Sequence, residues 1–138
     1  MSQVVDRQLL LEQVQSLLKP IAGTRQLAVF PDSAAEFQRK YLKSKTGALL
    51  VSYAGSRRVS ADEGTTGRQM AVDVLVLSRR LSGDAGALAT VADIEEATDE
   101  KRFELSGFGW EVAFLRDRFI TENDEVYTYS CSLTCTPL

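Results

Sequence analysis

The residues that could do chemistry are few in this chain, because its sequence contains no histidine. Histidine is the commonest general base and the commonest metal ligand of proteins. Two cysteines remain, Cys131 and Cys135, in a segment that alternates like a strand. Their spacing corresponds to ~13 Å along a strand, whereas the Cα atoms of a disulfide lie about 4.4–6.8 Å apart. We therefore expect two free, buried thiols, no zinc site, and folding in a reducing cytoplasm.

Two short motifs resemble parts of known catalytic sites. "SLLK" (residues 16–19) and "KTG" (residues 45–47) match two of the three boxes of penicillin-binding proteins and serine β-lactamases. The third box is absent, and Ser16 falls on an amphipathic helix pattern. "KSKTG" also ends like a phosphate-binding loop, but it lacks the earlier glycine of a Walker A motif. No nucleophile, base and orienting group can be assembled, so the sequence predicts neither an enzyme nor a cofactor.

Acidic residues gather in "DIEEATDE", at the end of a helix predicted within residues 83–100. Asp93, Glu96 and Asp99 suggest a cation site, but a solvated acidic face accounts for the same pattern, and we predict no metal. Acids at the C-terminus of a helix are mildly unfavourable, because the helix dipole places partial negative charge there. The pattern therefore suggests that this end of the helix meets a basic partner.

A long polar segment, "SYAGSRRVSADEGTTGR" (residues 52–68), separates two apolar runs. Glycines and arginines can bind phosphate, but this segment connects two predicted strands, and no helix N-terminus follows to supply a dipole. Acids also offset its arginines. A loop of about 12 residues in a small domain is usually functional or disordered, and we interpret this one as a charged docking loop. Its candidate contact residues are Arg57, Arg58, Asp62, Glu63 and Arg68.

A second pair of candidates lies in "FLRDRF" (residues 114–119). Arg116 and Arg118 fall on one face of a predicted strand, and Asp117 falls on the other. Arginines in such a position can pair with acids of a neighbouring subunit. The opposite charges of the polar segment could likewise pair head to tail between identical copies.

The composition of the chain excludes several classes of function. Its 138 residues, 44% of them apolar, predict a single domain over residues 1–138 with a core that needs no disulfide. The net charge is −3 and the pI about 5.0, without a basic stripe, so we expect no nucleic-acid binding. No apolar run approaches the roughly 20 residues of a membrane span. Charges interrupt the apolar part of the N-terminal segment, which is unlike a signal peptide.

Helices with a 3.6-residue apolar period must position these residues. The first is predicted over residues 3–19 and ends at Pro20, which cannot continue the hydrogen bonding of a helix. Asp84 is expected to cap the second, acidic helix. A short helix between them begins after Asp32 or Ser33, either of which can serve as its N-cap.

Strands are predicted from β-branched and aromatic runs at residues 25–30, 47–55 and 68–80, and from a final hairpin over residues 105–137 with its turn at 121–124. Apolar residues on both faces of the third run place it centrally in the sheet. The last strand alternates between a packing row and a row of hydroxyls, and Trp110 is expected in the core. This order predicts an α+β fold, with a mixed, mostly antiparallel sheet of about 4–5 strands and two main helices packed on one face.

The order of these landmarks resembles a family of tail proteins from Mu-like contractile-tailed bacteriophages. The landmarks are the N-terminal helix, "GALLVSYAGSRR", the polar segment, "MAVDVLVLSRRL" running into "GDAGALATVADIEEA", and the terminal "DEVYTYSCSLTC". The resemblance covers nearly the whole chain. It implies a tail terminator or tail-completion subunit, a structural protein that forms a homo-oligomeric ring, often six-fold, at the end of the tail tube. The implied partners are the tube and neighbouring tail or neck proteins, and the implied location is the virion tail, after assembly in the host cytoplasm.

Two other functions stay open on the sequence alone. One is a different phage adaptor, such as a head–tail joining or baseplate-proximal protein. The other is a small-molecule-binding α+β domain, in which Trp110 and Phe114 would line a pocket beside Tyr127 and Tyr129. Gene neighbours separate the adaptor from a tail terminator, and a thermal-shift screen with metabolites and metals tests the small-molecule-binding domain.

Overall fold

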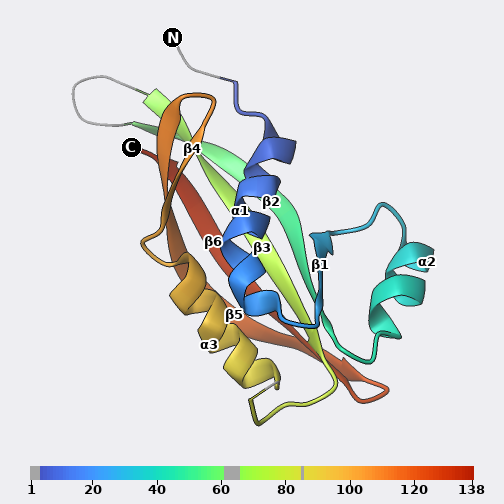
Figure 1. Ribbon diagram of the computed structural model, residues 1–138. Coiled ribbons are helices and arrows are strands. Elements are labelled where there is room, and N and C mark those ends of the chain that lie inside the picture. Colours follow the sequence, from blue (N-terminus) through green and yellow to red (C-terminus); the bar gives the residue numbers. More distant parts are fainter. Residues whose placement is uncertain (1–3, 61–65, 85) are drawn as a thin grey trace.

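Helical segments separate runs of one, two and three strands along the chain, in the arrangement of Figure 1. A computed structural model describes residues 4–60, 66–84 and 86–138. In chain order the elements are α1 (Arg7–Ala22), β1 (Gln26–Val29), α2 (Ala34–Phe37), the π-helix η1 (Gln38–Leu42), β2 (Ala48–Ser60), β3 (Thr66–Ser78), α3 (Ala87–Thr98), β4 (Arg102–Leu105), β5 (Phe108–Asn123) and β6 (Val126–Pro137).

The strands form a sheet in the order β1-β2-β3-β6-β5-β4. β1 runs parallel to β2, and the other neighbouring pairs are antiparallel. The predicted α+β fold with a mixed, mostly antiparallel sheet is therefore confirmed, although the described residues form six strands instead of four or five. The strand that the sequence analysis missed is β4, because its 4 residues are too few for an alternating pattern to stand out.

Helices α1 and α3 cover one face of the sheet, as predicted (Figure 1). Fully burying one aliphatic side chain stabilises a fold by about 1.5–3 kcal/mol, so the side chains between the helices and the sheet hold the two layers together. Those with no exposed surface are Leu10, Val14, Leu18, Leu49, Val51, Met70, Val72, Val74, Val76, Ile94, Cys131 and Cys135. The predicted burial of both free cysteines is thus confirmed.

Trp110 is a core residue, as predicted, with 3% of its surface exposed. Its ring stacks on that of Phe103 from β4, with the centroids 6.4 Å apart and the planes 4° from parallel. No described residue accepts a hydrogen bond from its buried indole N–H. The contact fixes the short strand β4 against β5 through side chains as well as through the backbone ladder.

A third helical segment, α2 with η1, packs at one corner of the opposite face. Its Phe37 and Tyr41 contact Ala48 and Leu50 of β2, which alternate with residues of the main core. The prediction of helices on one face therefore describes α1 and α3 only. β3 is apolar on both faces and lies between β2 and β6, as its sequence pattern predicts.

The segment predicted as a loop is mostly strand, so the predicted loop conformation is wrong, whereas its docking role stays a prediction. β2 and β3 continue their ladder well beyond the helices, through the pair of Arg58 with Arg68. A bulge between Tyr53 and Gly55 shifts the register, and Gly55 adopts a φ of 134°, which favours glycine. Polar residues occupy both faces of this outer ladder because neither face meets the core, so the sequence shows no period of two there.

Helix α1 begins and ends later than predicted: it starts at Arg7, because residues 4–6 are not helical, and it ends at Ala22. Asp6 caps it by accepting a hydrogen bond from the backbone N–H of Leu9 at 3.1 Å. The helix continues through Pro20 to Ala22, and Gly23 ends it with a φ of 61°. The predicted stop at Pro20 is wrong because a proline in the last turn removes only one hydrogen bond, and the burial of Ala22 keeps the final residues helical.

Two other predicted boundaries also shift. Helix α3 starts after Gly86 instead of Asp84, and no side chain caps it. A Cβ at Gly86 would lie 2.6 Å from the carbonyl oxygen of Ser82, so the chain packs too closely there for a larger residue. The final hairpin turns at Asp124 and Glu125, with φ of 51° and 66°, as in a two-residue type I′ turn.

Candidate assembly surfaces

Away from α2, no described helix packs on the second face of the sheet. We call this part the open face and define it by Gln69, Ala71 and Asp73 of β3 with Ser132 and Thr134 of β6. These residues alternate along their strands with buried core residues. Their side chains are polar or small, so the open face presents hydrogen-bonding groups instead of an apolar surface.

A row of side chains crosses the open face from β2 to β4. Nε of Arg57 donates to Oε1 of Gln69 at 2.9 Å, and Nε2 of Gln69 donates to Oγ1 of Thr136 at 3.1 Å. Further along the same register, Nε of Arg102 donates to Oε2 of Glu111 at 3.1 Å. These contacts orient the exposed guanidinium of Arg57, which is one of the predicted contact residues.

A shallow hollow of about 300 Å³ lies beside this row. Gly55, Ala71 and Thr134 occupy neighbouring positions in the strand register and form its floor. Arg57 and Gln69 stand at its side. The described lining offers hydrogen-bond donors and acceptors but no carboxylate or thiol, so the hollow suits a polar side chain of a partner more than catalysis.

The other arginines of the polar segment lie on the second side of the β2–β3 ladder. Arg58 is exposed and directly opposite Arg68, whose Nε donates to Oγ of Ser56 at 3.1 Å. Asp62 and Glu63, predicted to pair with arginines of another copy, lie outside the described residues. The described members of the predicted cluster, Arg57, Arg58 and Arg68, thus lie on the two faces of a strand ladder instead of in one loop.

Arg116 and Arg118 are exposed on β5 and lie opposite Ser132 and Ser130 of β6, whereas Asp117 lies on the other face. The predicted division of these charges between two faces is confirmed. The arginine pair shares the open face with Arg57 but belongs to different rows of the register. A contact of these arginines with a neighbouring subunit remains a prediction.

The two thiols are unsuited to catalysis. Burial raises the pKa of Cys131 and of Cys135 from 9.0 to about 12, and the carboxylate of Asp117 adds to the effect at Cys131. Because the thiolate is the nucleophile and the metal ligand, a thiol that stays protonated at neutral pH performs neither role. Both cysteines therefore act as core residues.

The described residues offer neither a metal site nor a ligand pocket of the kind considered from the sequence. Across residues 4–60, 66–84 and 86–138, no group of three His, Cys, Asp or Glu residues could hold a metal ion. Within these ranges no helix is long and apolar enough to span a bilayer. Trp110 and Tyr127 pair with Pro137 and Glu122 at opposite ends of β6, so the ligand pocket considered from the sequence does not form.

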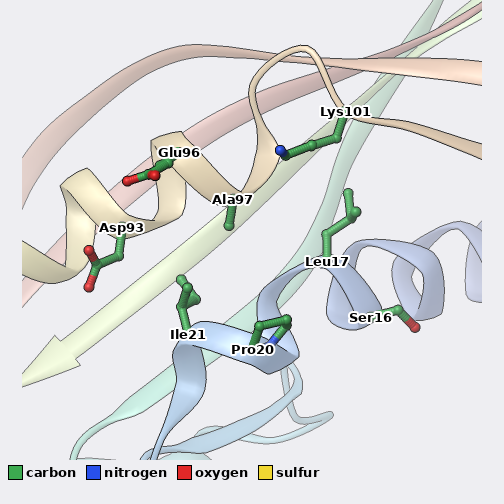
Figure 2. A pocket seen from close by; sticks show the side chains of 8 residues that line it. All are labelled: Ser16, Leu17, Pro20, Ile21, Asp93, Glu96, Ala97 and Lys101. Atoms are coloured by element: carbon green, nitrogen blue, oxygen red, sulfur yellow. The ribbon is translucent and has the colours of Figure 1, made fainter.

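A groove of about 500 Å³ runs between α1 and α3 (Figure 2). Leu17 and Ile21 of α1 face Ala97 of α3 across it, and Asp93 and Glu96 stand along its α3 side. We call this site, together with Pro20, the helix groove. Its apolar floor and acidic side suit a partner with an apolar group flanked by cations.

The helix groove was not predicted, although its halves are visible in the sequence. Leu17 and Ile21 are one helical turn apart beside the buried stripe of α1, and Asp93 and Glu96 share a face of α3. Lys101, which follows α3, lies at one end of the groove. Only the packing of α1 against α3 joins these residues, and sequence periodicity does not specify which two helices meet.

The fold described above also occurs in a solved virion structure. It is similar to a chain in the solved structure described as "Virion of native gene transfer agent (GTA) particle", with a TM-score of 0.60 and 16% sequence identity over 90% of this chain and 90% of that chain. A likeness at this identity shows a shared fold. No curated protein matches the chain.

Residues 14–138 match the family described as Gp37 protein, and the chain belongs to that family. The family match and the shared fold support the broader part of the resemblance seen in the sequence, that of a virion structural protein. The narrower part, a tail terminator of the Mu-like kind, is a proposal.

Proposed function

We propose that the chain is a structural protein of a phage or prophage tail that forms a ring at the end of the tail tube. The observation that carries this proposal is the fold shared with a chain of a gene transfer agent virion over 90% of both chains. Membership of the Gp37 protein family supports it further. In this role the chain caps the tube or joins it to the neck, as a tail terminator or completion protein.

The surfaces of the molecule suit a structural role. The charged and polar groups described above are spread over the open face, the outer β2–β3 ladder and the helix groove. They do not converge on one enclosed site, as catalytic groups do. Surfaces of this kind provide contacts to several neighbours at once, which a ring subunit between a tube and a neck needs.

The chain acts in this proposal without a cofactor and with other proteins as its partners. These partners are further copies of itself, the tail tube and adjacent tail or neck proteins. Assembly takes place in the host cytoplasm, and the finished protein resides in the virion tail. Arg57, Arg58, Arg68, Arg116 and Arg118 are proposed to lie in these contacts, because each is on a strand surface that no described helix covers.

Deletion of the gene in a phage or prophage that encodes the chain tests the role. If the chain terminates tail growth, electron micrographs of the mutant lysate will show tubes longer than in the wild type, and complementation will restore the length. Tails of normal length that lie detached from heads would instead assign the head–tail joining role. Complete, infectious particles without the chain would refute a virion function.

A further inference from the structure

Two surfaces of opposite character lie on opposite sides of the molecule. One is the helix groove, and the other is the segment around α2 and η1, which we call the basic lobe (residues 30–46). We propose that copies of the chain associate head to tail, with the basic lobe of one copy seated in the helix groove of the next. This proposal rests on the ring of the proposed function and names the two surfaces that build it.

Two carboxylates, Asp93 and Glu96, line the helix groove, against one cation, Lys101, at its end. Helix α3 carries Asp93, Glu95 and Glu96 and no basic residue in its last turn, where the helix dipole adds partial negative charge. Asp93 and Glu96 make no ion pair with any described residue. Between them and α1 lies the apolar floor formed with Leu17 and Ile21, both partly buried.

The basic lobe has the complementary composition. Phe30 is 40% exposed and stacks on Phe37, with the ring centroids 5.2 Å apart. Four basic residues follow this aromatic pair in the sequence, and the two acids Asp32 and Glu36 lie between its members. Glu36 is engaged by Lys40 at 2.8 Å. The exposed cations that make no ion pair with described residues are Arg39, Lys43 and Lys45.

An exposed aromatic side chain, followed in the same lobe by a run of cations, fits an apolar floor beside acids. Burying the aromatic surface supplies the favourable contact, and the opposite charges select the partner and its orientation. The acids at the end of α3, unfavourable in an isolated helix, gain basic neighbours in such a contact.

The positions of the two surfaces determine what they can build. α2 follows the edge strand β1, whereas α3 packs beside α1 over β3, β5 and β6, on the other side of the molecule (Figure 1). Two different surfaces that face apart make a heterologous contact, which repeats from copy to copy and closes into a ring when the rotation fits. They do not make a two-fold dimer.

Charge exchange between the two surfaces tests the proposal. The groove variant is Asp93→Lys/Glu96→Lys, and the lobe variant is Arg39→Glu/Lys43→Glu. Each variant alone brings like charges together, so we expect its self-association constant, measured by analytical ultracentrifugation, to weaken at least ~10-fold. An equimolar mixture should regain association to within about 3-fold of the wild type, because each altered surface then meets one of opposite charge.

A matched control changes the same number of charges elsewhere. Glu104→Lys/Glu125→Lys alters two exposed carboxylates outside both surfaces and should leave self-association unchanged. Circular dichroism of all variants establishes that they are folded. Mixing that fails to restore association, while the variants are folded, would overturn the assignment of the surfaces.

Disulfide trapping provides a second readout that does not depend on a strong association. Glu96→Cys and Lys43→Cys are introduced into separate chains of distinguishable mass, and the mixture is oxidised mildly. Both native thiols are buried and do not compete. The proposal requires the mixed disulfide to form in excess over both homodimers, and a statistical mixture would count against it.

The outcomes separate this proposal from the proposed function. If the wild type associates and neither charge-reversal variant changes that association, the proposed contact between groove and lobe is refuted, but the proposed ring is not. Both the contact and the proposed tail function are refuted if the chain stays monomeric at millimolar concentration, yields no trapped disulfide and is absent from purified tails.

Discussion

Arg58 and Arg68 lie directly opposite each other on β2 and β3, which places two positive charges in one cross-strand pair. Like charges in this position are destabilising, so the pair is unfavourable for the isolated fold. A negatively charged neighbour would relieve this repulsion. The residues therefore fit an assembly contact better than a stabilising one.

Replacing one of these arginines should change the stability of the fold and its assembly in opposite directions. We expect Arg58→Glu to raise the free energy of unfolding by about 0.2–1 kcal/mol, because it creates an opposite-charge pair with Arg68, and to weaken assembly. Urea denaturation and incorporation into tails measure the two effects. Arg57→Glu is the control, since it loses the hydrogen bond to Gln69 and should gain no stability. Equal stability changes in the two variants would show that the cross-strand repulsion is absent.

The buried thiols give the fold a specific response to alkali. Their pKa values rise from 9.0 to about 12 on folding, so above pH 9 the unfolded chain has lost protons that the folded chain retains. The free energy of unfolding should therefore fall as the pH rises from about 9 towards 12. The double variant Cys131→Ala/Cys135→Ala should show a shallower fall over this interval in urea titrations. An identical slope in both proteins would mean that the thiols titrate alike in the two states.

At the scale of elements, the turn between β5 and β6 contains two residues with positive φ and neither is glycine. This conformation is strained for glutamate and suits glycine at the second position. We expect Glu125→Gly to stabilise the protein by about 0.5–1 kcal/mol, measured from the midpoint of thermal unfolding. Glu125→Ala removes the same side-chain charge but keeps the Cβ, and it should not stabilise. A gain in both variants would assign the effect to charge instead of backbone strain.

The elements that could be predicted are those with one face on the core. α1, β3 and the last strand each show the periodicity that burial imposes, and the sequence identified all three. The outer part of the β2–β3 ladder was missed because its backbone pairs without burying either face. β4 was missed because its pairing with β5 depends on Trp110 and Phe103, a contact between residues whose meeting is set by the fold.

The candidate surfaces were predictable to a similar extent. The sequence identified the exposed arginines of β2 and β5 and the acids of α3. The structure confirms that Arg116 and Arg118 share a face of β5. It did not identify the helix groove, because its α1 side and α3 side come together only through helix packing. Periodicity specifies the face of an element but not the element that covers it.

For the whole molecule, the single domain predicted from the sequence remains to be tested by unfolding. α1 and α3 share one buried cluster with β2, β3, β5 and β6, so we expect one cooperative transition. Circular dichroism and calorimetry should give the same midpoint. Two separate transitions would indicate that part of the chain folds independently.

The charged residues that give the net charge of −3 are unevenly distributed, with acids on α3 and basic residues around α2. Attraction between exposed surfaces is screened by salt, since the Debye length falls from about 10 Å at 0.1 M to about 3 Å at 1 M. Self-association of the wild type should weaken between these salt concentrations in sedimentation experiments. The mixture of groove and lobe variants should weaken in parallel. Association that strengthens with salt would indicate an apolar contact instead.

The single tryptophan supplies an optical consequence of the fold. Trp110 is buried against Phe103, and no described group hydrogen-bonds its indole N–H. We therefore expect its emission maximum at short wavelength in the folded protein, and a shift to longer wavelength when unfolding exposes the ring to water. The ring belongs to the core and to neither surface proposed to associate. Its emission colour can therefore follow unfolding within a mixture of free and assembled subunits, without an added dye.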